Sequence, residues 1–119
     1  MQTQEIAKHL VDYCRNGNFD TAQAKLFADN AVSIEPYSTP EFEKETKGLT
    51  AIKEKGKKFE SMVEEVHAIE ASDPLVAGNT IAFTMTMDMT MKGKGRMKMP
   101  ELCVYQVKDG KVVSEEFFV

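Results

Sequence analysis

The residue of greatest chemical interest in this 119-residue chain is a carboxylate within an otherwise apolar strand face. Positions 96–107 read RMKMPELCVYQV, in which alternate residues share one face of a strand. Glu101 is the charged member of that face; the others are Met97, Met99, Cys103, Tyr105 and Val107. An ionised carboxylate is costly among apolar side chains, so Glu101 must be protonated, paired or in contact with water. We expect either a proton-carrying acid in a pocket or a solvated residue beside a bend at Pro100.

The preceding strand supplies the wall that faces this carboxylate. Positions 80–91 read TIAFTMTMDMTM, an alternation with period two over the whole segment. Its apolar side consists of Ile81, Phe83, Met85, Met87, Met89 and Met91. Methionine side chains adapt to ligands of varied shape, but they also fill ordinary cores. The pattern therefore predicts either a pocket wall or a packed core.

The turn between these two strands decides which residues face one another. A two-residue loop would place Met91 opposite Arg96, an apolar row against a basic one. A three-residue loop from Gly93 to Gly95 instead pairs Lys92 with Arg96, and burial favours it because a one-residue slip inverts every side chain. The predicted cross-strand pairs are Glu101 with Met87, Cys103 with Met85, and Tyr105 with Phe83.

The last hairpin leaves two carboxylates as alternatives. A two-residue turn at Asp109-Gly110 would direct Glu116 toward the methionine face. A three-residue loop that begins at Lys108 would direct Glu115 there. We prefer Glu115, and the choice stays open at this point.

The elements that must position these residues are helical in the first half of the chain. Apolar spacing predicts a first helix over about residues 3–16 and a short second helix that begins near Phe19, with Asp20 as its N-cap. A short strand, 31–35, ends before Pro36, and the charged segment 36–47 reads as a loop or lid. A third helix follows Gly48.

The third helix carries an apolar stripe of Ile52, Phe59 and Val63. Gly56 lies in its interior, where glycine costs roughly 1 kcal/mol relative to alanine, so we expect close packing there. We interpret its basic residues as a solvated face; they are Lys53, Lys55, Lys57 and Lys58. Strands are expected at about 65–73, 79–92, 96–107 and 111–118, which makes the chain α+β.

Composition narrows the class of protein. The length fits a single domain over residues 1–119, and 42% hydrophobic and 29% charged residues are ordinary for a globular protein. A net charge of −4 argues against a nucleic-acid partner, and no apolar run approaches the ~20 residues of a membrane span. Two cysteines make no disulfide framework, which favours reduced thiols in a cytoplasmic protein. No His, Cys and carboxylate spacing resembles a metal site, so we expect no cofactor.

Three stretches resemble one superfamily: LFADNAVSIEP at 26–36, GLTAIKEKGKKF at 48–59 and YQVKDGKVV at 105–113. They are similar to the nuclear transport factor 2-like, or SnoaL-like, proteins, and the order of elements agrees along nearly the whole chain. The resemblance implies a cone-shaped α+β barrel in which three N-terminal helices pack on a strongly curved mixed or antiparallel sheet. That scaffold carries isomerases, cyclases, dehydratases, hydrolases and non-catalytic proteins, so the fold alone does not give the function.

Within the superfamily, the ketosteroid isomerase pattern is the nearest chemical comparison. The resemblance places Glu35 at the position of the general base, at the end of a strand before a proline. The position of its tyrosine donor falls on Leu10, with Tyr13 one turn later, and that of its acidic donor falls on Cys103, two residues after Glu101. The departures argue against a true steroid isomerase and leave a carboxylate-lined pocket.

The resulting hypothesis is a small-molecule pocket with cofactor-free acid/base chemistry on an apolar carbonyl compound. Its catalytic residues would be Glu35 as the base, with Glu101 and Tyr13 stabilising the developing charge. Its ligand-binding residues would be Phe83, Met85, Met87, Met97, Met99, Cys103, Tyr105, Phe59 and Glu115. The alternative is a binding module without catalysis, or a dimerisation module with a vestigial pocket.

The opposite face of the sheet is small and semi-apolar. Its members are Thr80, Ala82, Thr84, Thr86, Leu102 and Val104. Proteins of the resembled family often dimerise through that side of the sheet. We therefore expect a homodimer formed through this outer face.

Overall fold

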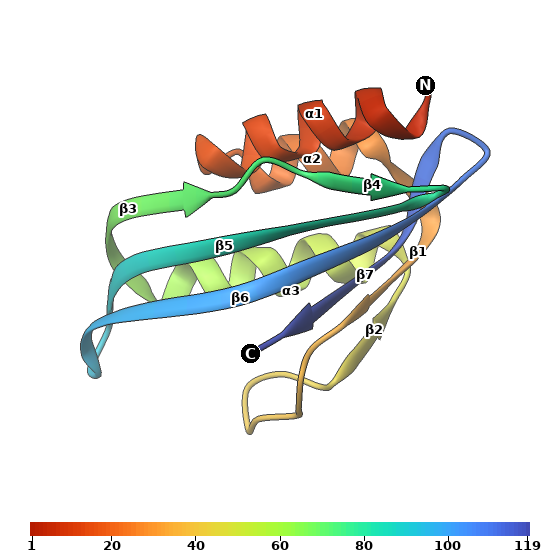
Figure 1. Ribbon diagram of the computed structural model, residues 1–119. Coiled ribbons are helices and arrows are strands. Elements are labelled where there is room, and N and C mark those ends of the chain that lie inside the picture. The colour runs from red at the N-terminus through yellow and green to blue at the C-terminus, as the bar shows by residue number, and fades with distance from the viewer.

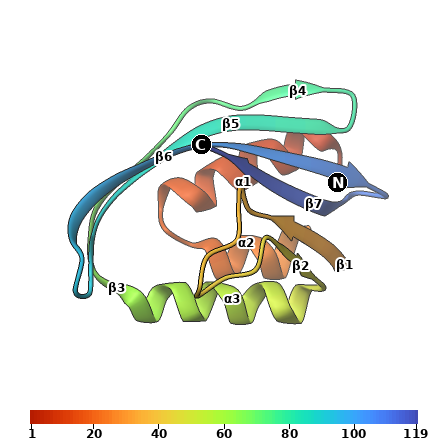
Figure 2. The ribbon, with the colours of Figure 1, turned by 90° about the horizontal axis from the view of Figure 1, so that it is seen from below.

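Three helices and a seven-stranded sheet make up the computed structural model, which describes residues 1–119 (Figure 1). All three helices lie on one side of the sheet and leave its outer face uncovered (Figure 2). The elements in chain order are α1 (Thr3–Arg15), α2 (Phe19–Leu26), β1 (Phe27–Ile34), β2 (Glu45–Lys47), α3 (Leu49–Met62), β3 (Val63–Ala71), β4 (Leu75–Ala77), β5 (Thr80–Met91), β6 (Gly95–Lys108) and β7 (Lys111–Phe118). None of the helices is long and apolar enough to cross a membrane.

The sheet is mixed and open. Its strand order is β2-β1-β7-β6-β5-β3, with β4 paired to β5; β1 and β7 run parallel, and the other pairs are antiparallel. The far ends of β5 and β6 bend toward α3 (Figure 2). The α+β class, the three helices and the mixed sheet are thus confirmed. The predicted cone-shaped barrel and strong curvature are not: the sheet ends at the edge strands β2 and β3, does not close and is not strongly curled. The short strands β2 and β4 were not expected from the sequence.

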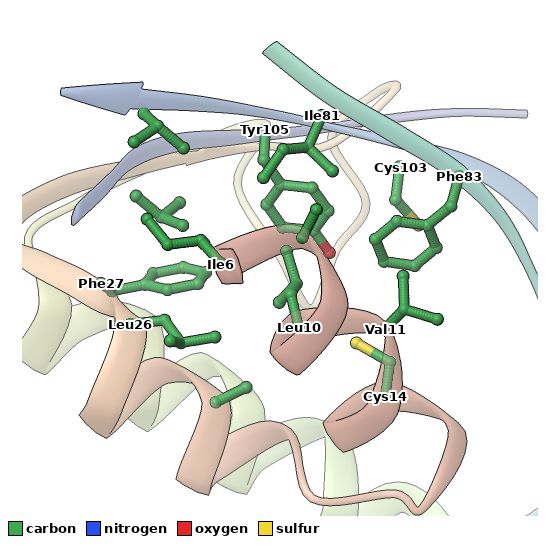
Figure 3. Close-up of a cluster of buried hydrophobic side chains, with 14 of the residues drawn as sticks. Ile6, Leu10, Val11, Cys14, Leu26, Phe27, Ile81, Phe83, Cys103 and Tyr105 are labelled. Atoms are coloured by element: carbon green, nitrogen blue, oxygen red, sulfur yellow. The ribbon is translucent and has the colours of Figure 1, made fainter. Parts of the chain in front are cut away.

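The core lies between α1 and the inner face of β5 and β6. The buried side of α1 consists of Ile6, Ala7, Leu10, Val11 and Cys14. In Figure 3, Ile6, Leu10, Val11 and Cys14 lie on the side of the helix that faces the sheet residues Ile81, Phe83, Cys103 and Tyr105. Phe83 and Tyr105 stack with ring centroids 5.5 Å apart, and Phe27 meets Tyr105 edge-on. The first helix thus covers the middle of the inner sheet face.

Helix ends differ from the prediction only in detail. The first helix begins at Thr3, and the Glu5 side chain accepts the Gln2 N–H there. The second helix begins at Phe19, so its N-cap is Asn18 and not Asp20. In α3, a Cβ built on Gly56 meets no atom within 4 Å, so the close packing expected at that glycine is wrong.

The register between β5 and β6 is displaced by two residues from the predicted one. The loop comprises Lys92–Lys94, and Met91 pairs with Gly95. Gly93 and Gly95 have φ of 75° and 84°, and this permits the turn to close one residue earlier than expected. The observed pairs are Glu101 with Met85, Cys103 with Phe83, and Tyr105 with Ile81. Because the shift is even, every side chain stays on its predicted face.

The last hairpin settles which carboxylate faces inward. Asp109 and Gly110 form a two-residue turn with φ of 52° and 74°, which alone would direct Glu116 to the interior. The register then shifts between Gln106 and Val107, where β7 carries one extra residue. Glu115 consequently lies opposite Tyr105 and is 6% exposed. The preferred residue is correct, but a bulge produces it and not a three-residue loop.

Candidate functional site

Polar side chains meet in the interior where β1, β7 and α3 converge. The parallel pairing of β1 with β7 places Ser33 beside Glu115, and both side chains are buried. Glu35 follows the end of β1, and Lys55 reaches the same place from α3. Three segments distant in the sequence thus contribute four residues to one polar cluster in an apolar interior.

A continuous chain of hydrogen bonds joins these four residues. The Lys55 ammonium donates to Ser33 Oγ at 2.6 Å and to Glu35 Oε2 at 2.9 Å. The Ser33 hydroxyl donates in turn to Glu115 Oε1 at 2.9 Å. Charge-assisted bonds of this kind are the strong ones, so the cluster has a defined geometry.

Lys55 corrects the expectation that the basic residues of α3 form a solvated face. Its side chain is 17% exposed and ion-paired with Glu35. Lys55 follows Ile52 by three residues and precedes Phe59 by four, which places it on the apolar stripe of the helix. That spacing was the signal that could have identified it. Lys57, by contrast, is exposed as expected.

Glu101 extends the polar group along β6. The Cys103 thiol, on the same strand face, donates to Glu101 Oε1 at 3.7 Å. Burial, reinforced by the negative charge of Glu35, raises the pKa of Glu101 to about 7. Glu35 and Glu101, which were predicted to act together, share no hydrogen bond: Glu35 accepts from Lys55, and Glu101 accepts from Cys103.

Glu115 has a similarly raised pKa. Burial lifts it to about 7, while the Lys55 charge and the Ser33 hydrogen bond act in the opposite direction. Both carboxyl groups therefore change charge near neutral pH, the range in which a general acid or base is most effective.

The two buried cysteines and Tyr105 stay protonated at neutral pH. Burial raises the pKa of the Cys14 thiol to about 12 and moves that of Cys103 higher still. Burial also raises the pKa of the Tyr105 hydroxyl well above its ordinary value. The thiols therefore have no thiolate character, and the proton-exchanging groups of the interior are carboxylates.

Some of the other predicted site residues are packed in the core, and the rest are half-buried. Tyr13 packs at the edge of the core, and the side-chain hydrogen bonds at Glu35 and Glu101 come from Lys55 and Cys103. Fully packed core positions are occupied by Phe83, Met85, Cys103 and Tyr105. Half-buried positions on the inner side are occupied by Phe59, Met87, Met97 and Met99.

An open cleft of about 740 Å³ borders this half-buried part of the methionine wall. Its apolar lining comprises Phe19, Phe59, Val63, Val66, Ile69, Met87 and Met89. Phe59 and Met87 are the predicted site residues in this cleft, and its lining includes neither Glu101 nor the residues of the Lys55 cluster. A second cleft, of about 610 Å³, surrounds Met1 and Gly110 and contains none of the predicted site residues.

The segment between β1 and β2 packs beside the cluster. The Glu35 N–H donates to the Lys44 carbonyl at 2.7 Å, which closes this loop at its base. Phe42 lies against Phe59 of α3, with ring centroids 6.5 Å apart, and the Lys58 ammonium lies 5.0 Å from the Phe42 ring. The predicted loop is thus anchored on the helix that carries Lys55.

No group of His, Cys, Asp and Glu side chains has the arrangement of a metal site.

Comparison with known proteins agrees with this architecture. The family model of the SnoaL-like domain matches residues 1–119. A Mesorhizobium loti structure, described as a candidate SnoaL-like polyketide cyclase and also as a carbohydrate phosphatase, is 31% identical, covers 100% of both chains and has a TM-score of 0.91. No curated protein matches the chain in sequence.

More distant structures share the fold. A candidate isomerase from Bacillus subtilis is 20% identical over 98% of this chain and 88% of its own, with a TM-score of 0.74. A protein of ketosteroid isomerase-like fold from Catenulispora acidiphila, solved in complex with trimethylamine, is 17% identical over 97% and 85%, with a TM-score of 0.70. The nuclear transport factor 2-like fold inferred from the sequence is thereby confirmed, and the chain belongs to the SnoaL-like domain family.

Proposed function

We propose that this protein binds a small, largely apolar carbonyl compound and catalyses cofactor-free proton transfer on it. Glu35 would take the proton from the carbon next to the carbonyl; the electron pair of that C–H bond would form the C=C bond of an enolate, and the π pair of the carbonyl would move onto its oxygen. Glu101 would donate a hydrogen bond or a proton to the developing charge, with Tyr13 as an accessory donor. Return of a proton to the same carbon or to a neighbouring one completes an isomerisation or prepares a cyclisation or dehydration.

The observation that carries this proposal is the placement of Glu101. Its carboxyl group lies on the methionine face, accepts a hydrogen bond from Cys103 and is subject to the charge of Glu35. A carboxyl group in such surroundings exchanges its proton near neutral pH, and a second carboxylate beside it supplies the opposite half of an acid/base pair. The relatives described as polyketide cyclases and isomerases support the same class of chemistry.

Proton–deuterium exchange tests this function without knowledge of the natural substrate. The wild-type protein is expected to accelerate exchange next to the carbonyl of β-tetralone in heavy water, followed by NMR. Glu35→Gln should lower the rate by about 100-fold or more, because a general base is lost. Glu43→Gln, an exposed carboxylate of the same loop, is the matched control and should leave the rate unchanged.

The second candidate function is binding without turnover, and the buried, packed positions of Phe83, Met85 and Tyr105 favour it. If β-tetralone shifts the methionine methyl signals but exchanges no faster than in buffer, the protein is a binding module. The ligand-bound relative from Catenulispora acidiphila supports a small molecule as the partner in either case.

We also propose that two copies associate through the outer sheet face. Leu102 pairs with Phe118 there, and the two side chains are 41% and 46% exposed. With two free, buried cysteines, Cys14 and Cys103, a reducing compartment such as the cytoplasm is the location we propose.

A further inference from the structure

Lys55 has a donor that the protein does not use. An ammonium group carries three N–H bonds, and two of them go to Ser33 Oγ and Glu35 Oε2. No protein acceptor takes the third. The ammonium group lies beside the Glu35 carboxylate, and the Lys55 side chain as a whole is 17% exposed, so protein does not enclose it completely.

The surroundings hold the ammonium in one place. Ser33 Oγ accepts a hydrogen bond from Lys55 and donates one to Glu115, so its hydroxyl is engaged on both sides. Glu115 is held by the bulge in β7 and lies opposite Tyr105. Lysine side chains are ordinarily flexible, and an ammonium group held by two acceptors, Ser33 in β1 and Glu35 just after it, has already lost much of that freedom before a ligand binds.

The charges around Lys55 leave it able to hold an anionic oxygen. Glu35 offsets its charge, and the other two carboxyl groups of the interior, Glu101 and Glu115, are partly protonated near neutral pH. The three N–H bonds diverge, so one ammonium can serve Ser33, Glu35 and a third oxygen at once. A preformed donor at the position of developing charge is the arrangement that stabilises an enolate.

We propose that Lys55 binds the reacting oxygen of the ligand through its third N–H, and that Ser33 and Glu115 are the positioning residues that hold it. The inference rests on the proposed function and deepens it, because it names the ligand class: compounds whose oxygen is, or becomes, an enolate or phenolate. Glu35 and Lys55 would then act on adjacent atoms of one ligand, Glu35 at carbon and Lys55 at oxygen.

Binding of para-nitrophenol tests this assignment directly, since its phenolate form has its own visible absorbance. At a pH below the solution pKa of the phenol, wild-type protein is expected to bind it and to increase the phenolate absorbance. Lys55→Met, of similar length but uncharged, should weaken phenolate binding by about tenfold or more, because a charge-assisted hydrogen bond is lost. Lys57→Met, an exposed position on the same helix, is the control and should bind as the wild type does.

Further variants separate a positioning role from a merely structural one. Glu115→Ala should lower the phenolate absorbance of the complex, whereas Glu115→Gln keeps an acceptor for the Ser33 hydroxyl and should restore it. Lys55→Arg retains the charge and guards against a folding defect in Lys55→Met; it should bind more tightly than Lys55→Met. Glu35→Gln removes the competing anion, so it should bind the phenolate at least as tightly as the wild type.

The outcomes distinguish this inference from the proposed function. Phenolate binding that depends on Lys55, without ketone exchange, would leave the inference standing and remove the catalytic function. Four results would each overturn the role given to Lys55. Two concern the variant: Lys55→Met does not slow ketone exchange, or it does not weaken phenolate binding. The other two concern the wild-type protein: it takes up only the neutral phenol, or it does not bind the probe.

Discussion

At the scale of single residues, the chemistry of this protein depends on carboxyl groups removed from water. Glu101 and Glu115 both lie on the inner side of the sheet, and burial is the main cause of their raised pKa. A charge so placed destabilises the fold, which natural proteins tolerate chiefly at functional sites. Burial of Glu101 and Glu115 therefore has two effects: it brings their pKa values near neutral pH, and it lowers the stability of the folded protein when they are ionised.

The cost appears as a pH dependence of stability. The pKa of Glu115 is about 7 in the folded chain against an ordinary 4.5, so the folded state holds more protons between these values. Its contribution to the free energy of unfolding is therefore fully present below pH 4.5 and is lost as the pH rises through 7. Glu115→Gln should remove this dependence and raise stability above pH 7 by about 3 kcal/mol relative to wild type.

Urea unfolding at a series of pH values measures this effect. Glu116→Gln, the neighbouring carboxylate on the opposite side of β7, is the matched control. A Glu115→Gln variant whose stability follows the wild-type pH profile would show that Glu115 is ionised and solvated in the folded protein.

At the scale of elements, α3 carries residues of the candidate site on its inner face and a destabilising glycine in its interior. Ile52, Lys55 and Phe59 share its inner face, and Gly56 lies next to Lys55 without any atom near its missing side chain. A glycine with ordinary helical geometry and free space has only an entropic cost. This helix should therefore accept alanine at position 56.

Gly56→Ala is expected to stabilise the protein by about 0.5–1 kcal/mol, as measured by thermal or urea unfolding. Gly110→Ala provides the contrast, because φ is +74° there and a Cβ would lie 3.1 Å from the Met1 nitrogen. That variant should be destabilised. Loss of stability in Gly56→Ala would mean that the helix packs more closely at this point than described.

The elements also show how far the sequence leads. Period-two alternation predicted β5 and β6 with the correct inward face for Glu101, because the side-chain period is fixed by strand geometry. Loop conformation could not be predicted as well. Glycines with positive φ let the β5–β6 turn close one residue earlier than expected, and a bulge in β7 changed which carboxylate faces inward after the last turn. Lys55 was missed because its charge was weighed more heavily than its helical spacing. The link between Ser33 and Glu115 depends on the parallel pairing of β1 with β7, which local sequence does not determine.

At the scale of the whole molecule, one side of the sheet is covered by helices and the other is open (Figure 2). The open side presents exposed apolar residues at Leu102 and Phe118 near the C-terminus. Exposed apolar patches on a sheet are typical of subunit contacts. If two copies meet there, the pocket of each copy remains on the far side of its own sheet.

Sedimentation equilibrium tests this association. Wild-type protein is expected to be dimeric at micromolar concentration, and Leu102→Glu should be monomeric because it introduces a charge into the contact. Lys57→Glu, on α3, should leave the dimer intact. A wild-type monomer at high micromolar concentration would contradict the proposed outer-face contact.

The measurement that most directly tests the central claim is an NMR titration of the glutamate carboxyl carbons. Assignment of the two critical signals comes from Glu101→Gln and Glu115→Gln. The proposed chemistry requires that the carboxyl group of Glu101 titrate near pH 7, apart from the exposed glutamates, and Glu115 should titrate in the same range. If Glu101 titrates near 4.5 with the exposed glutamates, it has no proton to donate at neutral pH, and the proposed chemistry is contradicted.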